Sequence, residues 1–287
     1  MISGLRPGRL PHPGTVLVWS VPLAICAVFA WMLGDILLHG LDHLSFSFLI
    51  EEPRKSGRAG GIGPILVATC LIVTICLTVS LPISLGAAVL LSEFLRHADR
   101  SGRAIRISLD MLAGIPSIVF GIVGNAVFCR FFGFGYSIMA GGLTLACMVL
   151  PVLIRTTEQA IGDVPEAYRL GAVALGFSKL RTIRRILIPI AAPSILVGAL
   201  LAVGRSFAET AALLFTSGYV DRMPSSLGDP GRALSIHILD LAMNIPGGDA
   251  AAYGSALVLI GLLFFINGAI QCITLVWRRT AGLTAAI

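Results

Sequence analysis

The sequence predicts an all-α integral membrane protein with six transmembrane helices. Its 287 residues are 56% hydrophobic and only 13% charged, with a mean hydropathy of +0.91, a composition typical of a bilayer protein. Six apolar windows each supply the roughly 20 residues that a helix needs to cross a hydrocarbon core. The net charge of +6 comes without any basic patch interleaved with aromatic residues, so no nucleic-acid partner is predicted.

The six windows follow one another along the chain. They cover approximately residues 15–38, 62–91, 107–129, 134–154, 187–217 and 252–277. The first window follows Arg6 and Arg9 in the manner of a signal peptide, but it is long and lacks an A-x-A site, so we expect a retained span. The second and fifth exceed one span, and we expect tilting, a kink at Pro82 or Pro193, or an extension beyond the bilayer.

The basic residues predict the orientation of the spans. With the N-terminus inside, fourteen of the 21 Lys and Arg residues are cytoplasmic: Arg6, Arg9, Arg96, Arg100, Arg103, Arg106, Arg155, Arg169, Lys179, Arg181, Arg184, Arg185, Arg278 and Arg279. Six lie outside: Arg54, Lys55, Arg58, Arg130, Arg222 and Arg232. The excess on one side predicts that both termini are cytoplasmic. Arg205 alone is left within a span.

The longest inside loop, residues 155–185, is predicted to be structured. Pro165 suits the first position of a helix over "EAYRLGAVAL", and Gly176 suits the left-handed residue that ends it. A second helix, "SKLRTIRRILIP", has Ser178 as its expected N-cap. We expect two short helices at the cytoplasmic face. The pattern leaves open a plain amphipathic anchor at the membrane surface.

The outside loops carry weaker signals. Residues 218–249 hold four Asp and two Arg, and "RALSIHILDLAM" predicts a short amphipathic helix on the outer surface, within an ordered loop or a contact for an external partner. His39 and His43 have a spacing that can hold a metal on a helix, but no third ligand is near, so no metal site is predicted.

Sequence motifs for catalysis are absent. The chain has no GxxxxGK[ST] phosphate loop, HExxH, GxSxG or EF-hand loop, and Asp35 and Asp110 lie near the ends of their windows rather than forming an intramembrane pair. We therefore predict no catalytic residue, no enzyme activity and no cofactor on this chain. It cannot hydrolyse ATP through a phosphate loop.

Two charges interrupt the fifth window, in the stretch "GRSFAETAALLFTSG". Burying an ionisable side chain in lipid costs at least about 2.5 kcal/mol, so Arg205 and Glu209 are expected to face a cavity or a partner. On one continuous helix they share a face of small or polar residues: Gly198, Ala202, Arg205, Glu209, Ala212 and Thr216. This face indicates either a substrate path or a buried ion pair that only fixes helix packing. An arginine fork binds oxyanions, and the glutamate would hold it when the site is empty or accept from protonated oxygens.

The inside loop resembles the EAA loop of permease subunits of binding-protein-dependent ABC importers. Gly176 is followed by nine residues and then by Ile186 and Pro189, as in that loop, although Leu170 stands where a glutamate is usual. Two further stretches, "LDMLAGIPSIVFGIVG" and "GRSFAETAALLFTSG", are similar to segments of PstA-type permeases of phosphate importers, with Ala208 where a glycine is common. The resemblance covers approximately residues 62–277.

The resemblance implies a type I ABC importer permease with a MetI-like fold in the bacterial plasma (inner) membrane. Its expected domains are an N-terminal helix and outer loop (1–61), a permease domain (62–277) with an EAA-like coupling loop (155–185), and a cytoplasmic tail (278–287). Its expected partners are a homologous PstC-type permease, two copies of a PstB-type ATPase that binds ATP and Mg, and an extracytoplasmic PstS-type phosphate-binding protein. The cargo is then inorganic phosphate, released inwards by alternating access.

The candidate site residues form two groups. The expected substrate path contains Arg205, Glu209, Thr210 and Thr216, and the expected coupling contacts are Ala172, Gly176, Ser178, Lys179, Arg184 and Pro189. Three alternatives stay open: an importer of phosphonate, sulfate or molybdate, a transporter or channel without an ATPase, and a scaffold whose partner permease carries the anion.

Overall fold

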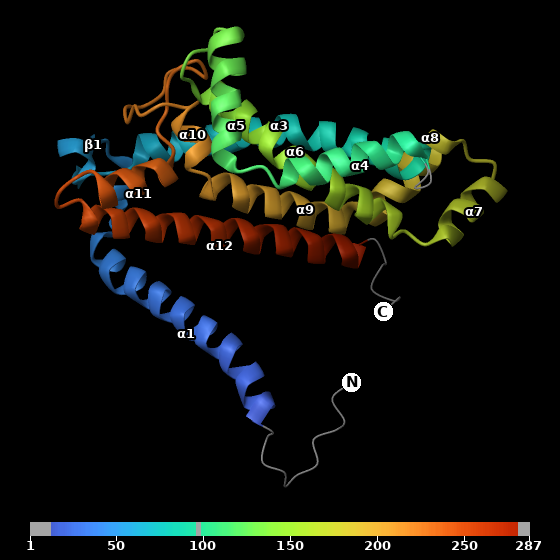
Figure 1. Cartoon of the computed structure of the whole chain (residues 1–287), viewed down its shortest axis with the longest axis horizontal. Coiled ribbons are helices and arrows are strands. Elements are labelled where there is room, and N and C mark those ends of the chain that lie inside the picture. Colours follow the sequence, from blue (N-terminus) through green and yellow to red (C-terminus); the bar gives the residue numbers. More distant parts are fainter. Residues whose placement is uncertain (1–12, 96–98, 281–287) are drawn as a thin grey trace.

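The computed structural model describes residues 13–95 and 99–280, and helices make up most of it (Figure 1). Long helices run along one axis of the molecule: α3 (Gly63–Val89), α6 (Ile138–Gly162), α9 (Ile188–Ala208) and α12 (Asp249–Thr280). Helix α1 (Pro13–Gly40) leaves this bundle at an angle. It is tied to α12 near its own C-terminal end, where the Tyr253 hydroxyl donates to Asp35 Oδ2 at 2.9 Å.

The third predicted span is not one straight helix. It is α4 (Arg100–Ala113), followed after a 99° bend by α5 (Ser117–Gly124), which continues into the π-helical segment η4 (Asn125–Phe131). Pro116 explains the bend, since proline has no N–H to donate and pushes the preceding residue out of the helical region. The described residues hold five helices long and apolar enough to cross a membrane, or six spans when this bent pair counts as one.

The fifth predicted span is shifted towards the N-terminus. One 30-residue segment, Lys179–Ala208, runs through α8 (Lys179–Thr182), the π-helical η5 (Ile183–Leu187) and α9. The predicted second loop helix is therefore the start of the span and not a separate surface helix. At the other end the helix stops at Ala208, and the four-residue α10 (Ala211–Leu214) stands apart from it.

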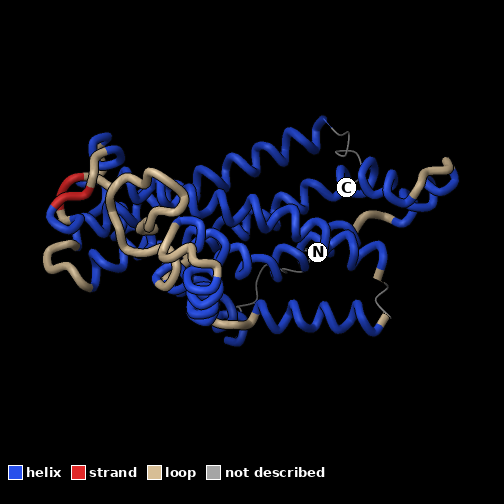
Figure 2. Tube along the Cα trace, turned by 90° about the horizontal axis from the view of Figure 1, so that it is seen from above, coloured by secondary structure: helices blue, strands red, loops and turns tan. Residues whose placement is uncertain are grey.

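Short elements and loops gather at the end of the bundle opposite α7 (Glu166–Ala174) (Figures 1 and 2). They are the 3-10 turn η1 (Leu41–His43), α2 (Phe46–Ile50), β1 (Pro53–Arg54), η2 (Lys55–Gly57), β2 (Ala59–Gly60) and α11 (Leu234–Met243). The two strands pair antiparallel, with Pro53 opposite Gly60.

Helix α11 confirms the predicted outer helix but not its predicted place on the surface. Leu234, Ile236 and His237 are fully buried within the described structure. The preceding loop is ordered by Asp229, whose carboxylate accepts from the backbone N–H and hydroxyl groups of Ser225 and Ser226. These bonds hold the pKa of Asp229 at about 2.

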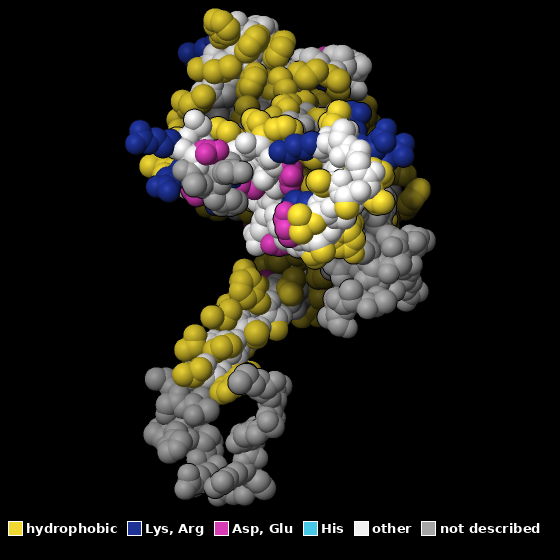
Figure 3. Space-filling view, turned by 90° about the vertical axis from the view of Figure 1, so that its right-hand side faces the viewer, with side chains coloured by type: hydrophobic (Ala, Val, Ile, Leu, Met, Phe, Trp, Pro, Cys, Tyr) yellow, Lys and Arg dark blue, Asp and Glu magenta, His cyan; other side chains and the backbone are white. Residues whose placement is uncertain are grey.

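The core lies where α3, α6 and α9 meet. A Cβ on Gly142 of α6 would lie only 2.6 Å from Ile75 Cβ, so the two longest buried helices touch through a glycine. Ile72, Leu145 and Leu153 are fully buried in this core. Figure 3 shows the bundle from the end that carries α7: acidic and basic side chains gather there, while the shaft of α1 is hydrophobic. An apolar shaft with charged ends suits a bilayer.

Candidate functional site

The helix that carries Arg205 ends within one turn of it, at Ala208. Glu209 has an extended backbone (φ −75°, ψ 124°), and its carbonyl accepts from the Ser235 hydroxyl of α11 at 2.6 Å. The predicted face along one continuous helix is therefore wrong beyond Ala208. Ala212 instead packs on α5, where a Cβ on Gly121 would lie 2.9 Å from the Ala212 Cα.

Arg205 and Glu209 form a loose pair at this break. The distance from Arg205 Nε to Glu209 Oε1 is 3.8 Å, and their side chains are 37% and 14% exposed. Arg205 Nε is itself buried and makes no hydrogen bond to the described part of the chain. The guanidinium thus keeps donors free, in a fork that matches an oxyanion.

The neighbours of Arg205 on α9 fix which way it faces. Ser206 is buried and lies 3.5 Å from Cys76 Sγ of α3, and Phe207 is buried in a cluster with residues of α3 and α12. Since these two residues turn towards the bundle, the partly exposed Arg205 side chain faces a side that this chain leaves uncovered.

The two predicted threonines differ. Thr210 is partly exposed and directly follows Glu209 at the break. Thr216 is fully buried, and its hydroxyl donates to the Ala212 carbonyl at 2.9 Å. Arg205 and Glu209 thus lie beside each other at the break, Thr210 is the next residue in the chain, and Thr216 is buried in the packing. The path roles of all four stay predictions.

The EAA-like loop has the predicted helix end. Gly176 has a φ of +72°, Gly176 N donates to the Val173 carbonyl at 2.9 Å, and Phe177 N donates to the Ala172 carbonyl at 2.9 Å. This pair of bonds is a Schellman motif, which requires the left-handed residue that glycine supplies. Ala172 is buried, so it fixes α7 rather than offering a surface.

The other predicted coupling residues have mixed placements. Ser178 lies at the N-cap of α8, but its side chain makes no capping hydrogen bond. Lys179 donates to the Glu93 carbonyl, at the end of the second span. Arg184 is exposed, and Pro189 is partly buried in the first turn of α9. Sequence spacing placed these residues at one end of the bundle but did not show which ones are free.

A buried charge network near the same end was missed. Arg106 of α4 is 8% exposed and donates from Nε to Glu158 Oε1 of α6 at 2.6 Å. Arg155 donates to the other oxygen of Glu158 at 2.9 Å and to Asp110 at 3.0 Å. The distribution of basic residues predicts Arg106 and Arg155 in cytoplasmic loops, whereas the structure places them within α4 and α6. The signal for Arg106 was the amphipathic pattern of residues 100–113, a half-span in which a buried arginine needs a partner.

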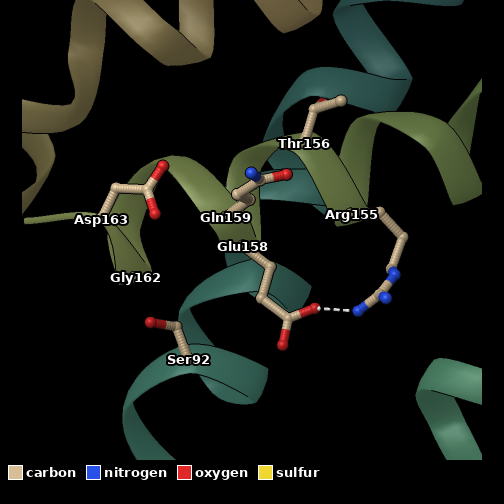
Figure 4. Close-up of a pocket in the computed structure, with 7 residues that line it drawn as sticks. All are labelled: Ser92, Arg155, Thr156, Glu158, Gln159, Gly162 and Asp163. Atoms are coloured by element: carbon tan, nitrogen blue, oxygen red, sulfur yellow. Dashed lines mark hydrogen bonds and ion pairs between the residues drawn. The ribbon is translucent and has the colours of Figure 1, made fainter.

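The network borders a cleft of ≈ 510 Å³ (Figure 4). Its lining residues are Ser92, Arg155, Thr156, Glu158, Gln159, Gly162 and Asp163. Two carboxylates and one arginine that is already paired make it a poor site for an anion. No group of three His, Cys, Asp or Glu side chains in residues 13–95 and 99–280 is placed to hold a metal ion, and His39 lies 3.2 Å from Asp35 instead.

Comparison with known proteins places this architecture in a family. The model of the binding-protein-dependent transport system inner membrane component matches residues 80–272. The chain belongs to this family. Its members are the permease subunits of ABC importers, which work with an ATPase and a binding protein, and this confirms the membrane location and the permease class predicted above.

Individual relatives agree with this family. The chain is 33% identical to the probable ABC transporter permease protein YqgI of Bacillus subtilis, over 89% of this chain and 92% of that protein. It is 31% identical to the phosphate transport system permease protein PstA 2 of Mycobacterium bovis, over 87% and 84% respectively. The resemblance to PstA-type permeases is confirmed.

A solved structure supports the fold. The inward-facing MetNI methionine ABC transporter has a chain similar to this one with a TM-score of 0.57 and 17% identity, over 76% of this chain and 94% of that chain. The predicted MetI-like fold is thus confirmed. At this identity the likeness carries no information on the cargo.

Proposed function

We propose that this permease imports inorganic phosphate, driven by ATP that a partner subunit hydrolyses. The observation that carries the proposal is the Arg205 guanidinium, loosely paired at a helix break and facing an uncovered side of the bundle. A fixed cation with free donors stabilises an anion in a low-dielectric region. The name of the similar PstA 2 protein supports phosphate as that anion.

Glu209 suits a protonated oxyanion. An ionised carboxylate only accepts hydrogen bonds, so it repels a fully ionised anion and accepts from one that still carries a proton. Phosphate carries at least one proton at neutral pH, and sulfate carries none. The 3.8 Å separation leaves Glu209 close enough to hold Arg205 while the path is empty.

The family resemblance supplies the partners, and each is assigned here to one surface of the chain. A homologous PstC-type permease would cover the open side of Arg205 and share the path. Two copies of a PstB-type ATPase would bind ATP and Mg and dock at α7, where Leu170, Val173 and the C-cap residue Leu175 are large apolar residues exposed on this chain. A PstS-type phosphate-binding protein would meet the opposite end. Both termini would then be cytoplasmic.

The pathway role of Arg205 is tested by Arg205→Gln in proteoliposomes that contain the full complex. We expect labelled phosphate uptake to fall at least about a hundredfold, the loss of a charge-assisted contact in a desolvated path. Assembly should be unchanged, because Arg205 Nε makes no hydrogen bond that holds the described structure together. Arg222→Gln, on an exposed loop residue, is the matched control and should transport normally.

The rival readings give different results in the same assay. If unlabelled sulfate, molybdate or phosphonate competes with labelled phosphate more strongly than unlabelled phosphate does, that anion is the cargo. Uptake by the lone chain without its ATPase would indicate a secondary transporter or channel. If the Arg205→Gln complex keeps near-normal uptake, and uptake is lost when an arginine of the partner permease is changed, this chain is a scaffold.

A further inference from the structure

The second span ends in a π-helical turn, η3 (Leu90–Phe94), and residues of the EAA-like loop contact this turn. Arg169 of α7 donates to the same oxygen of Glu93 twice, from Nε at 3.1 Å and from Nη2 at 2.9 Å. The Glu93 side chain is 11% exposed and that of Arg169 is 18% exposed. This pair is therefore shielded from solvent, unlike an ordinary surface ion pair.

Arg169 also closes the end of α6. It donates to the carbonyls of Ile161 at 3.0 Å and Val164 at 2.6 Å, which lie where α6 runs out of helical partners. A cation at a helix C-terminus satisfies free carbonyls and the negative end of the dipole. One side chain of α7 thus joins the ends of α3 and α6.

The other helix of the loop reaches the same turn. Lys179 of α8 donates to the Glu93 carbonyl, and its ammonium lies 4.2 Å from the centre of the Phe94 ring. Arg169 before the Gly176 turn therefore contacts Glu93, and Lys179 after the turn contacts Glu93 and Phe94. Any displacement of α7 relative to the spans has to strain these contacts.

Arg106 of α4 also binds η3 and the residue after it. Its Nη2 donates to the carbonyls of Leu91 at 2.7 Å and Leu95 at 3.3 Å, while its Nε pairs with Glu158. The end of α3 is thus clamped between α7 and α4. These bonds leave η3 little freedom to absorb motion by itself.

We infer that Glu93 is the positioning residue that passes the displacement of the EAA-like loop to the spans. The route continues along α4 to α5, where Gly121 packs on Ala212, and then to η4, where Asn125 Nδ2 donates to the Phe215 carbonyl at 2.7 Å. Phe215 follows the break that carries Glu209. This assignment goes beyond phosphate import and holds for any cargo.

The test uses the assembled complex and a readout that needs no substrate. Ala208→Cys is introduced next to the path after the exposed Cys26, Cys70, Cys147 and Cys272 are changed to Ser. ATP with vanadate traps the closed ATPase dimer, and the change in maleimide labelling of Ala208→Cys reports movement at the path. Glu93→Gln should reduce this change about tenfold, within the usual range of coupling between sites, while ATP hydrolysis stays within about twofold.

Glu166→Gln is the matched control. Glu166 also faces Arg169, at 3.5 Å, but its side chain is 70% exposed, so its loss should leave the labelling change intact. Glu93→Gln with a normal labelling change overturns the inference. If Glu93→Gln lowers the yield of complex, Arg169→Lys replaces it as the test variant. Lysine keeps the charge but cannot bind Glu93 and the carbonyls of Ile161 and Val164 at once. A normal labelling change in the Arg169→Lys complex would also overturn the inference. If the unchanged complex does not take up phosphate, only the proposal that phosphate is the cargo is refuted, and the inference on Glu93 is unaffected.

Discussion

At the scale of single residues, the two kinds of Arg–Glu pair in this chain differ in geometry. Arg106 and Glu158 are buried and 2.6 Å apart, and both are held by further hydrogen bonds. Arg205 and Glu209 are 3.8 Å apart, and Arg205 Nε has no hydrogen-bond partner in the described residues. A tight, buried pair braces helices, even though Arg106 Nη1 also lacks a partner in the described residues, whereas a loose and partly exposed pair leaves donors for a ligand. The charges alone could not distinguish the two roles.

His237 of α11 makes a further prediction at this scale. It is fully buried, and neither ring nitrogen has a partner in the described structure. Burial, with added repulsion from Arg232, lowers its pKa from 6.5 to about 4, although Asp221 and Asp240 oppose the shift. Between about pH 6.5 and pH 4, His237 therefore binds a proton in the unfolded chain but not in the folded chain. The free energy of unfolding that is present at pH 7 is lost as the pH falls through this range.

The loss expected from a shift of this size is about 3 kcal/mol once the pH is below about 4, and about 2 kcal/mol of it is present at pH 5. Thermal unfolding of the purified chain in detergent at pH 7.5 and pH 5 measures this second value. His237→Leu, which fills the same buried site without a titrating group, should be less sensitive to this change. An equal fall in melting temperature for both proteins would assign the pH dependence to other groups.

At the scale of elements, the apolar windows located the long apolar helices but placed the fifth span too far towards the C-terminus and missed two interruptions. Window lengths and Gly176 were read correctly because composition and glycine chemistry act locally. The 99° bend at Gly114 to Pro116 and the break at Glu209 were missed. The break depends on Ser235, 26 residues away, which binds the Glu209 carbonyl, and no local pattern records such a partner.

The Schellman end of α7 gives a prediction for an element. Gly176→Ala places a side chain at φ +72°, which costs about 1 kcal/mol in the left-handed region. We expect the EAA-like loop to loosen and the ATPase to co-purify less well with the permease. Gly171→Ala in the same helix is the control: it has open space around its Cβ position, and alanine favours a helix there. Equal recovery of ATPase from both variants would contradict the coupling role of this turn.

At the scale of the whole molecule, the bundle has two different ends. One end carries α7, Arg169 and the buried clamps, and the other carries the short strands, the Asp229 turn and α11. The predicted path residues Arg205, Glu209 and Thr210 lie at the break whose backbone α11 binds. On the proposal above, movement of α7 reaches this break through the ends of α3, α4 and α6, which Arg106 and Arg169 join, and then through α5. The domain bounds and the inward orientation of the termini stay predictions.

The orientation is tested by labelling the two ends separately. In the chain without exposed native cysteines, expressed without its ATPase, Ser178→Cys marks the loop end and Ser225→Cys marks the other, and both positions are exposed. Because basic residues favour the cytoplasmic side, an impermeant maleimide should label Ser225→Cys in spheroplasts and Ser178→Cys only in inverted vesicles. Labelling of Ser178→Cys from outside would show that the loop end faces outwards, opposite to the predicted orientation. It would also remove α7 from the reach of a cytoplasmic ATPase, and with it the route through Glu93.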